Sequence, residues 1–106
     1  MEMQTLELNA NTISLIIQGN MDAEGSRSAQ PYIDSIIDDQ NKTEIEVDFK
    51  DVQFLDSSGI GALVYLYKRL VERNRQMRIE NVSGQPLEIM NLLRISQAIP
   101  VNSKLH

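Results

Sequence analysis

A chain of 106 residues has room for one compact domain and not for a second. With 42% hydrophobic residues it can form a core, and the lack of cysteine excludes a disulfide framework, a thiol nucleophile and a zinc–thiolate site. Asp and Glu number 15 against 10 Lys and Arg, a net charge of −5. This balance argues against a nucleic-acid surface, because phosphate contacts need clustered basic side chains.

The N-terminus shows no targeting or membrane signal. Residues 1–4 lack a basic region followed by an apolar run, and no apolar stretch approaches the roughly 18 residues of a membrane span. We therefore expect a soluble, cytoplasmic protein that does not insert into a membrane. If it controls transcription, we expect it to act through another protein.

The first part of the chain predicts a β-hairpin. Residues 3–8 and 12–18 read as strands, joined by the polar turn Asn9-Ala10-Asn11. The run Gly19-Asn20-Met21-Asp22 then ends the second strand.

A helix follows, although its start is difficult to place. Ala29, Ile33 and Ile36 recur at helical spacing. Pro31 is tolerated in a first turn but costs about 3 kcal/mol in a helix interior. We therefore expect the helix to begin near Ser28, which can cap it, and to end at Asp39.

The second half continues the alternation of strands and helices. The pattern predicts a strand over residues 43–48, a short polar turn, and a helix from about Ser58 to Asn74. A fourth strand over residues 76–81 and a short helix opening at Pro86 follow. The predicted last element is a strand or extended segment over residues 95–101, before a frayed tail. The order indicates an α/β domain with a mixed sheet.

Two serines stand where the central turn opens into its helix. The first backbone N–H groups of a helix have no partner within it and carry the positive end of its dipole, so an added phosphate on Ser57 or Ser58 could be held there. The alternative is that the serines cap the helix. Gly59 and Gly61 leave room for another backbone to approach.

The run Phe54-Leu55-Asp56-Ser57-Ser58-Gly59-Ile60-Gly61-Ala62-Leu63 resembles the signature of STAS domains, in particular the single-domain anti-sigma factor antagonists of bacteria. Gly19-Asn20-Met21-Asp22 is similar to the family's Gly-x-Leu-Asp turn, with Met21 in place of Leu. The resemblance covers nearly the whole chain and implies one STAS domain over residues 1–106. Its fold would be a mixed sheet of four to five strands with helices packed mainly on one face.

The resemblance also implies a mechanism. In antagonists of this family the serine directly after the Asp is phosphorylated, which corresponds to Ser57, with Ser58 as a supporting or alternative residue. The unphosphorylated form would bind a serine-kinase anti-sigma factor or a related kinase and phosphatase regulator. Phosphorylation would release it, and a PP2C-type phosphatase would reset the switch. The output would be a sigma factor or another process, such as biofilm control. The expected partner-binding residues are Asp22, Asp56, Ser57, Ser58, Gly59, Ile60 and Gly61.

The carboxylates allow another interpretation. Asp22, Asp48, Asp51 and Asp56 could form a Mg²⁺ site or an acid–base pair. We favour turn and cap roles, because no cysteine is present, the single histidine is His106, and a serine nucleophile lacks a base. We therefore expect no catalytic residue, metal or cofactor. The protein would be a switch and not an enzyme, and ATP would belong to the kinase partner.

Two other functions stay open at this stage. The chain could be a constitutive STAS subunit of a membrane transporter's cytoplasmic assembly, with the same turn as a permanent docking patch. It could also be a small nucleotide-binding regulator. For the latter, Gly59-Ile60-Gly61 is weak support, because a Walker motif requires a Lys after its last glycine.

Overall fold

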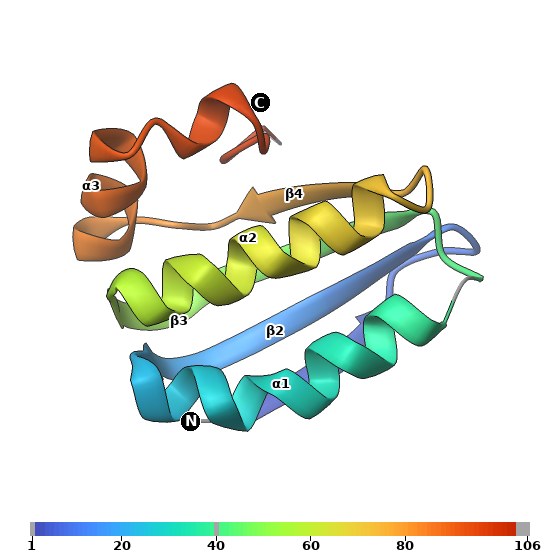
Figure 1. The fold of residues 1–106 in the computed structure, drawn as a ribbon, viewed down its shortest axis with the longest axis horizontal. Coiled ribbons are helices and arrows are strands. Elements are labelled where there is room, and N and C mark those ends of the chain that lie inside the picture. Colours follow the sequence, from blue (N-terminus) through green and yellow to red (C-terminus); the bar gives the residue numbers. More distant parts are fainter. Residues whose placement is uncertain (1, 40, 104–106) are drawn as a thin grey trace.

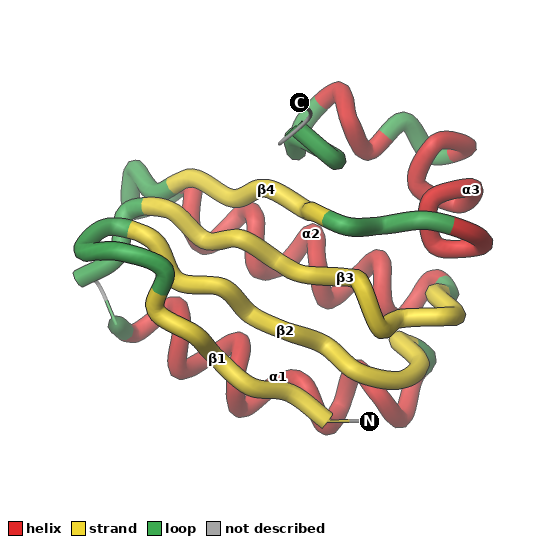
Figure 2. Tube along the Cα trace, turned by 180° about the vertical axis from the view of Figure 1, so that it is seen from behind, coloured by secondary structure: helices red, strands yellow, loops and turns green. Residues whose placement is uncertain are grey.

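The computed structural model describes residues 2–39 and 41–103. Its four strands form one mixed sheet in the order β1-β2-β3-β4, in which β1 pairs antiparallel with β2 and the other pairs are parallel. Helices α1 and α2 lie on one face of this sheet, and the other face is open (Figures 1 and 2). The predicted fold class is therefore confirmed. In chain order the elements are β1 (Glu2–Glu7), β2 (Thr12–Met21), α1 (Ala23–Asp38), β3 (Glu44–Leu55), α2 (Ser57–Val71), β4 (Gln76–Glu80) and α3 (Gly84–Leu92), followed by a 3-10 turn (Ile95–Gln97).

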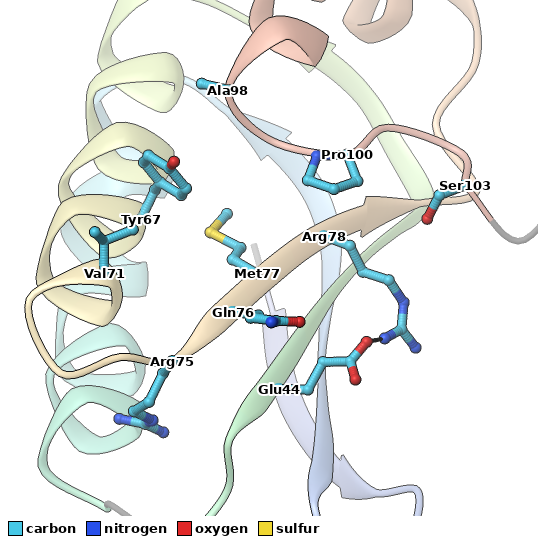
Figure 3. A pocket seen from close by; sticks show the side chains of 10 residues that line it. All are labelled: Glu44, Tyr67, Val71, Arg75, Gln76, Met77, Arg78, Ala98, Pro100 and Ser103. Carbon is cyan, nitrogen blue, oxygen red and sulfur yellow. Dashed lines mark ion pairs between the residues drawn. The ribbon is translucent and has the colours of Figure 1, made fainter.

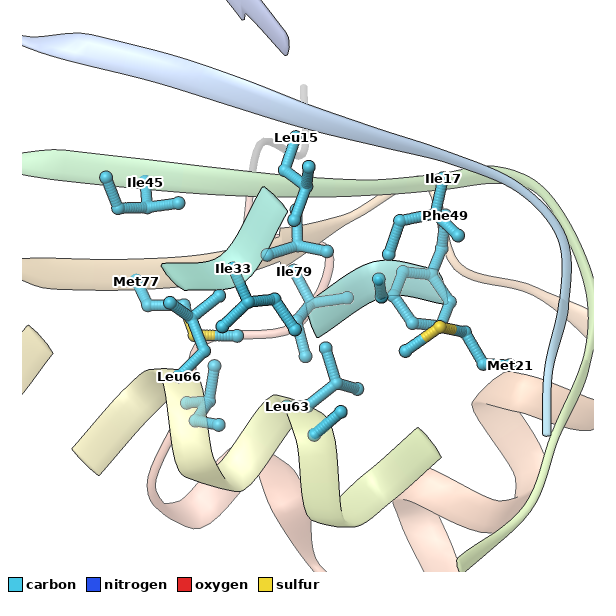
Figure 4. Close-up of a cluster of buried hydrophobic side chains, with 14 of the residues drawn as sticks. Leu15, Ile17, Met21, Ile33, Ile45, Phe49, Leu63, Leu66, Met77 and Ile79 are labelled. Atoms are coloured by element: carbon cyan, nitrogen blue, oxygen red, sulfur yellow. The ribbon is translucent and has the colours of Figure 1, made fainter. Parts of the chain in front are cut away.

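The core lies between the sheet and these two helices (Figure 4). Alternate residues of the parallel strands point toward the helices, as the period of two in a strand requires. Side chains of α1 and α2 fill the space above them, and the aromatic ring of Phe49 is buried at the end of the sheet where β2 runs into α1. Residues at most 3% exposed include Leu15, Ile17, Met21, Ile33, Ile45, Val47, Phe49, Leu63, Leu66, Met77 and Ile79.

The open face of the sheet carries a group of charges that neutralise one another. Arg78 of β4 forms ion pairs with Glu44 and Glu46 of the neighbouring strand β3 and with Glu80 of its own strand. Glu46 and Glu80 are almost fully buried, and a buried carboxylate is tolerated when it is paired and hydrogen-bonded. Ser14 donates a further hydrogen bond to Glu46, at 3.0 Å.

Strands β2 and β3 are longer than predicted. The expected turn after Asp48 is part of β3, which continues to Leu55, and β2 continues to Met21. The pairing of the two strands is irregular here, with register shifts on either side of Gly19, whose φ of 107° suits glycine. As a result Phe49, Val52 and Leu55 are buried at steps of three, and the alternation that marks a strand is lost.

The predicted start of α1 is wrong. The helix begins at Ala23, with Asp22 as its N-cap, and Pro31 lies in its interior. Pro31 is on the exposed side of the helix, and the cost of its missing N–H is offset by the apolar face that the full-length helix buries. That face consists of Gly25, Ala29, Ile33, Ile36 and Ile37.

The C-terminal segment also differs from its prediction. Helix α3 is present, with Pro86 in its first turn as expected. The segment after it forms a 3-10 turn, and only Val101 makes a bridge, parallel to Ile79 at the edge of β4. Ile99 is 2% exposed and anchors this segment to the core. The prediction for the tail beyond Ser103 lies outside the described residues.

Arg75 joins the end of α1 to the segment that precedes β3. Its guanidinium donates to the carbonyl of Lys42 at 2.7 Å and to that of Ile37 at 3.1 Å. Burial lowers the pKa of Arg75 from its ordinary value, and the charge of Asp39 opposes that effect. An arginine has so high an ordinary pKa that the group stays charged at neutral pH.

Replacing Arg75 with Met should lower the free energy of unfolding by about 1–3 kcal/mol, because the carbonyls of Ile37 and Lys42 lose their donors inside the protein. Urea unfolding followed by circular dichroism measures the change. Arg73→Met is the matched control, since Arg73 is exposed and we expect its effect to stay within about 0.5 kcal/mol. Equal losses in both variants would show that Arg75 has no special structural role.

Candidate functional site

The candidate site forms where two strand-to-helix turns meet, at the C-terminal ends of β2 and β3. Asp22 caps α1, its carboxylate accepting a hydrogen bond from Gly25 N at 2.8 Å. Asp56 caps α2 in the same manner. The Asp56 amide donates to the Met21 carbonyl at 3.2 Å, so the two capping residues lie on adjoining turns. The expected neighbourhood of the Gly19–Asp22 and Asp56 turns is thus present in the structure.

Neither serine caps α2. One carboxylate oxygen of Asp56, Oδ1, accepts from Ser58 N at 2.9 Å and from Gly59 N at 3.2 Å. Ser57 and Ser58 are exposed first-turn residues, and neither hydroxyl makes a hydrogen bond within residues 2–39 and 41–103. The capping interpretation of the two serines is therefore wrong, and both hydroxyls are free to react.

The expectation that backbone donors would hold an added phosphate also needs correction. The amides of Ser58 and Gly59 already bond the Asp56 carboxylate, and the Ile60 amide bonds the Asp56 carbonyl at 3.0 Å. Of the four amides that open α2, only that of Ser57 has no such bond. A phosphate at this position would therefore lie beside a carboxylate and find few free donors.

The two glycines of the motif differ in their surroundings. Gly59 is buried, and a Cβ added there would overlap the Met21 carbonyl oxygen and the Leu55 side chain. The predicted close approach at Gly59 is therefore made by this chain's own backbone. Gly61 is exposed, and apart from its chain neighbours and the backbone of its own helix an added Cβ would meet no described atom within 4 Å. Between them, Ile60 is half-buried and packs against the core.

Gln85 of α3 is a contact of the site that the sequence did not indicate. Its side-chain oxygen accepts from Leu55 N at 2.8 Å, and its side-chain nitrogen donates to Leu55 O at 2.9 Å. The amide thus pairs with the end of β3 as a neighbouring strand would. This contact fixes the residue directly before Asp56. No local sequence pattern predicts this contact, because its two partners are 30 residues apart in the chain.

A groove of about 680 Å³ runs between α1 and α2 and begins at the candidate site. Arg27 and Gln30 of α1 stand on one side, and Tyr65 of α2 stands on the other. The guanidinium of Arg69 lies 5.8 Å from the centre of the Tyr65 ring. The sequence analysis did not single out these side chains. Small residues complete the lining: Ala23, Ser26, Ser58, Gly61 and Ala62.

A second cavity, of about 360 Å³, lies beside the later turns of α2 (Figure 3). Tyr67, Val71 and Met77 give it an apolar wall, and Pro100 from the C-terminal segment lies across from them. None of the predicted site residues lines this cavity.

Asp48 and Asp51 do not join Asp22 and Asp56 in one acidic cluster. Asp48 lies within β3, eight residues before Asp56, and accepts hydrogen bonds from Lys50 N and the Asn81 side chain. Asp51 is also within the strand. Across residues 2–39 and 41–103, no group of three or more acidic, histidine or cysteine side chains is arranged to hold a metal ion. The Mg²⁺ alternative therefore has no support from the described part of the chain. Over the same residues, no helix has the length and apolar character needed to cross a membrane.

Alanine at the two glycines should have opposite effects on stability. Gly59→Ala should lower the free energy of unfolding by about 1–3 kcal/mol through overpacking against Met21 and Leu55. Gly61→Ala should raise it by about 0.5–1 kcal/mol, since the position is helical and unobstructed. Denaturant unfolding of both variants gives the two values. A loss at Gly61 equal to that at Gly59 would contradict the difference in their surroundings.

Comparisons with known proteins agree with the fold. The model of the STAS domain family matches residues 4–106. The anti-sigma-B factor antagonist of Bacillus subtilis (strain 168) is 21% identical over 96 residues, which cover 91% of this chain and 86% of that protein.

Two solved structures show the same fold. An anti-sigma factor antagonist from Mycobacterium paratuberculosis superimposes with a TM-score of 0.84 at 18% identity, covering 98% of this chain and 88% of that one. The Bacillus cell fate determinant SpoIIAA in its phosphorylated form gives a TM-score of 0.74 at 17% identity, covering 97% and 93%. With nearly its whole length matched by the family model, the chain belongs to the STAS domain family.

Proposed function

We propose that this protein is a phosphorylation-controlled interaction switch. Its unphosphorylated form binds a serine-kinase anti-sigma factor or a related kinase and phosphatase regulator, and phosphorylation of Ser57 releases that partner. The observation that carries the proposal is the environment of Ser57. Its hydroxyl is exposed at the start of α2, makes no hydrogen bond within the described residues, and directly follows the Asp56 cap.

In this site, a phosphate added to Ser57 would act by repelling the bound partner. A phosphate on serine carries about −1.5 to −2 charges at neutral pH. The amides that would otherwise neutralise it are bonded to Asp56, and Asp22 caps the adjoining turn. The new charge therefore faces the partner. Placing like charges together in an interface costs several kcal/mol, which is enough to dissociate a regulatory complex.

Release on phosphorylation needs no refolding of the domain. The turn before Ser57 is held by the Asp56–Met21 hydrogen bond and by the two bonds between Gln85 and Leu55. These contacts involve neither serine hydroxyl, so modification leaves them in place. A local change of charge at a fixed surface is one of the ways in which phosphorylation controls binding.

The comparisons support this function by analogy. The similar Bacillus subtilis protein is an anti-sigma factor antagonist, and SpoIIAA has been solved in a phosphorylated form. We further propose that a PP2C-type phosphatase restores the unphosphorylated state in the cytoplasm. The kinase activity and its ATP belong to the partner, and this chain acts as a regulator and not as an enzyme.

Ser57→Asp should weaken partner binding at least tenfold, which corresponds to about 1.4 kcal/mol. Ser57→Ala should bind like the wild type and accept no phosphate. Mass spectrometry of the protein from its native cell, with and without phosphatase treatment, locates the modification, and titration with the co-purified partner gives the affinities.

Ser96→Asp provides a control for charge alone, since Ser96 is exposed on the 3-10 turn after α3. It should leave the affinity within about twofold of the wild type, because an exposed charge outside an interface changes binding little. Full phosphorylation of the Ser57→Ala variant would show that Ser57 is the wrong residue. Tight binding by Ser57→Asp would rule out release by charge.

A further inference from the structure

The groove between α1 and α2 is continuous with the switch, because Ser58 belongs to both. Much of its lining consists of small residues, and among its described lining side chains only that of Arg27 is charged. The groove is mostly apolar, and the aromatic ring of Tyr65 closes one side. A surface of this kind accepts a segment of another protein that combines apolar contact with one opposite charge.

The glycine at position 61 indicates that another molecule contacts the groove. A glycine in a helix interior is unfavourable relative to alanine, because it loses more conformational freedom on folding. At Gly59 the chain's own Met21 carbonyl explains the glycine. At Gly61, apart from its chain neighbours and the backbone of its own helix, no described atom lies within 4 Å of where a Cβ would be, although the residue lies in the groove. A close approach from outside the domain accounts for a glycine here.

Arg27 indicates that a ligand of this groove would be negatively charged. It is exposed, and none of the ion pairs or hydrogen bonds between described side chains involves it. The nearby Arg69 differs, since it pairs with Glu72 at 2.7 Å. In a chain with a net charge of −5, an unpaired arginine on a groove wall selects an acidic ligand and disfavours a basic one.

We propose that this groove docks an acidic segment of the partner regulator, with an Asp or Glu of that segment pairing with Arg27 and its backbone lying against Gly61. The inference rests on the proposed function, because it describes a second part of the same partner interface. Ser57 would control that interface by charge, and the groove would provide selectivity for the partner.

A site-specific cross-link identifies the occupant. The chain has no cysteine, so Ala23→Cys, at an exposed position that lines the groove on the α1 side, provides a single attachment point for a maleimide photocross-linker and leaves Gly61 free for the close approach. The probe is the regulator that co-purifies with the tagged wild-type protein, purified and mixed with the labelled variant. We expect the cross-linked peptide to come from that regulator and to contain Asp or Glu close to the linked residue. Asn91→Cys, exposed on α3, is the control and should give little cross-linking.

Affinity measurements test the two contacts separately. Gly61→Leu, which fills the groove, and Arg27→Glu, which reverses its charge, should each weaken binding of the purified regulator at least tenfold. Asn91→Leu and Arg94→Glu are matched controls at exposed positions outside the groove and should stay within twofold. Lysine in place of the cross-linked acidic residue of the partner should restore binding to Arg27→Glu. Gly61→Ala, which we expect to fold at least as stably as the wild type, is a second test of close approach and should also bind more weakly.

The outcomes separate this inference from the proposed function. Wild-type affinity in Gly61→Leu and Arg27→Glu, together with loss of binding in Ser57→Asp, would overturn the groove and leave the switch standing. Loss of binding in the groove variants with full binding by Ser57→Asp would support the groove and overturn the switch. A cross-linked peptide from a second copy of this chain, or one without a nearby acidic residue, would overturn the proposed occupant.

Discussion

The hydrogen bond from the Asp56 amide to the Met21 carbonyl joins the two turns of the candidate site, and the rest of the site depends on it. It brings the end of β2 against the first turn of α2. That approach is possible only because residue 59 has no side chain, since a Cβ there would overlap the same Met21 carbonyl. One backbone contact thus explains both the buried glycine of the motif and the neighbourhood of Asp22 and Asp56.

The fold was largely predictable where burial is regular. Residues 43–48 alternate because the strand there has one face toward the helices, and Ile33 and Ile36 recur because α1 buries one stripe. Prediction failed where tertiary contacts override the local pattern. The irregular pairing of β2 with β3 removes the alternation after Asp48, and the core face of α1 outweighs the cost of Pro31.

The candidate site was predictable in its location and less so in its details. The run from Asp56 to Gly61 identifies a turn that opens a helix, and the structure confirms this. The choice of cap could not be read from it, because Asp and Ser are both favoured N-cap residues and three of them are adjacent. Gln85 could not be found at all, since its bonds to Leu55 depend on how α3 packs against the end of β3.

The identity of the cap has a consequence for how the site can respond to phosphorylation. A serine cap would commit a hydroxyl to the helix and leave amides available to an incoming anion, so that a phosphate at the first helical residue would be stabilised by the helix terminus. Here Asp56 takes the amides of Ser58 and Gly59 and leaves both hydroxyls free. The carboxylate thereby leaves Ser57 accessible and occupies the donors that could neutralise a phosphate added there. In such a site the added charge stays exposed at the surface that a bound partner would contact. The conformation of the domain itself would not need to change.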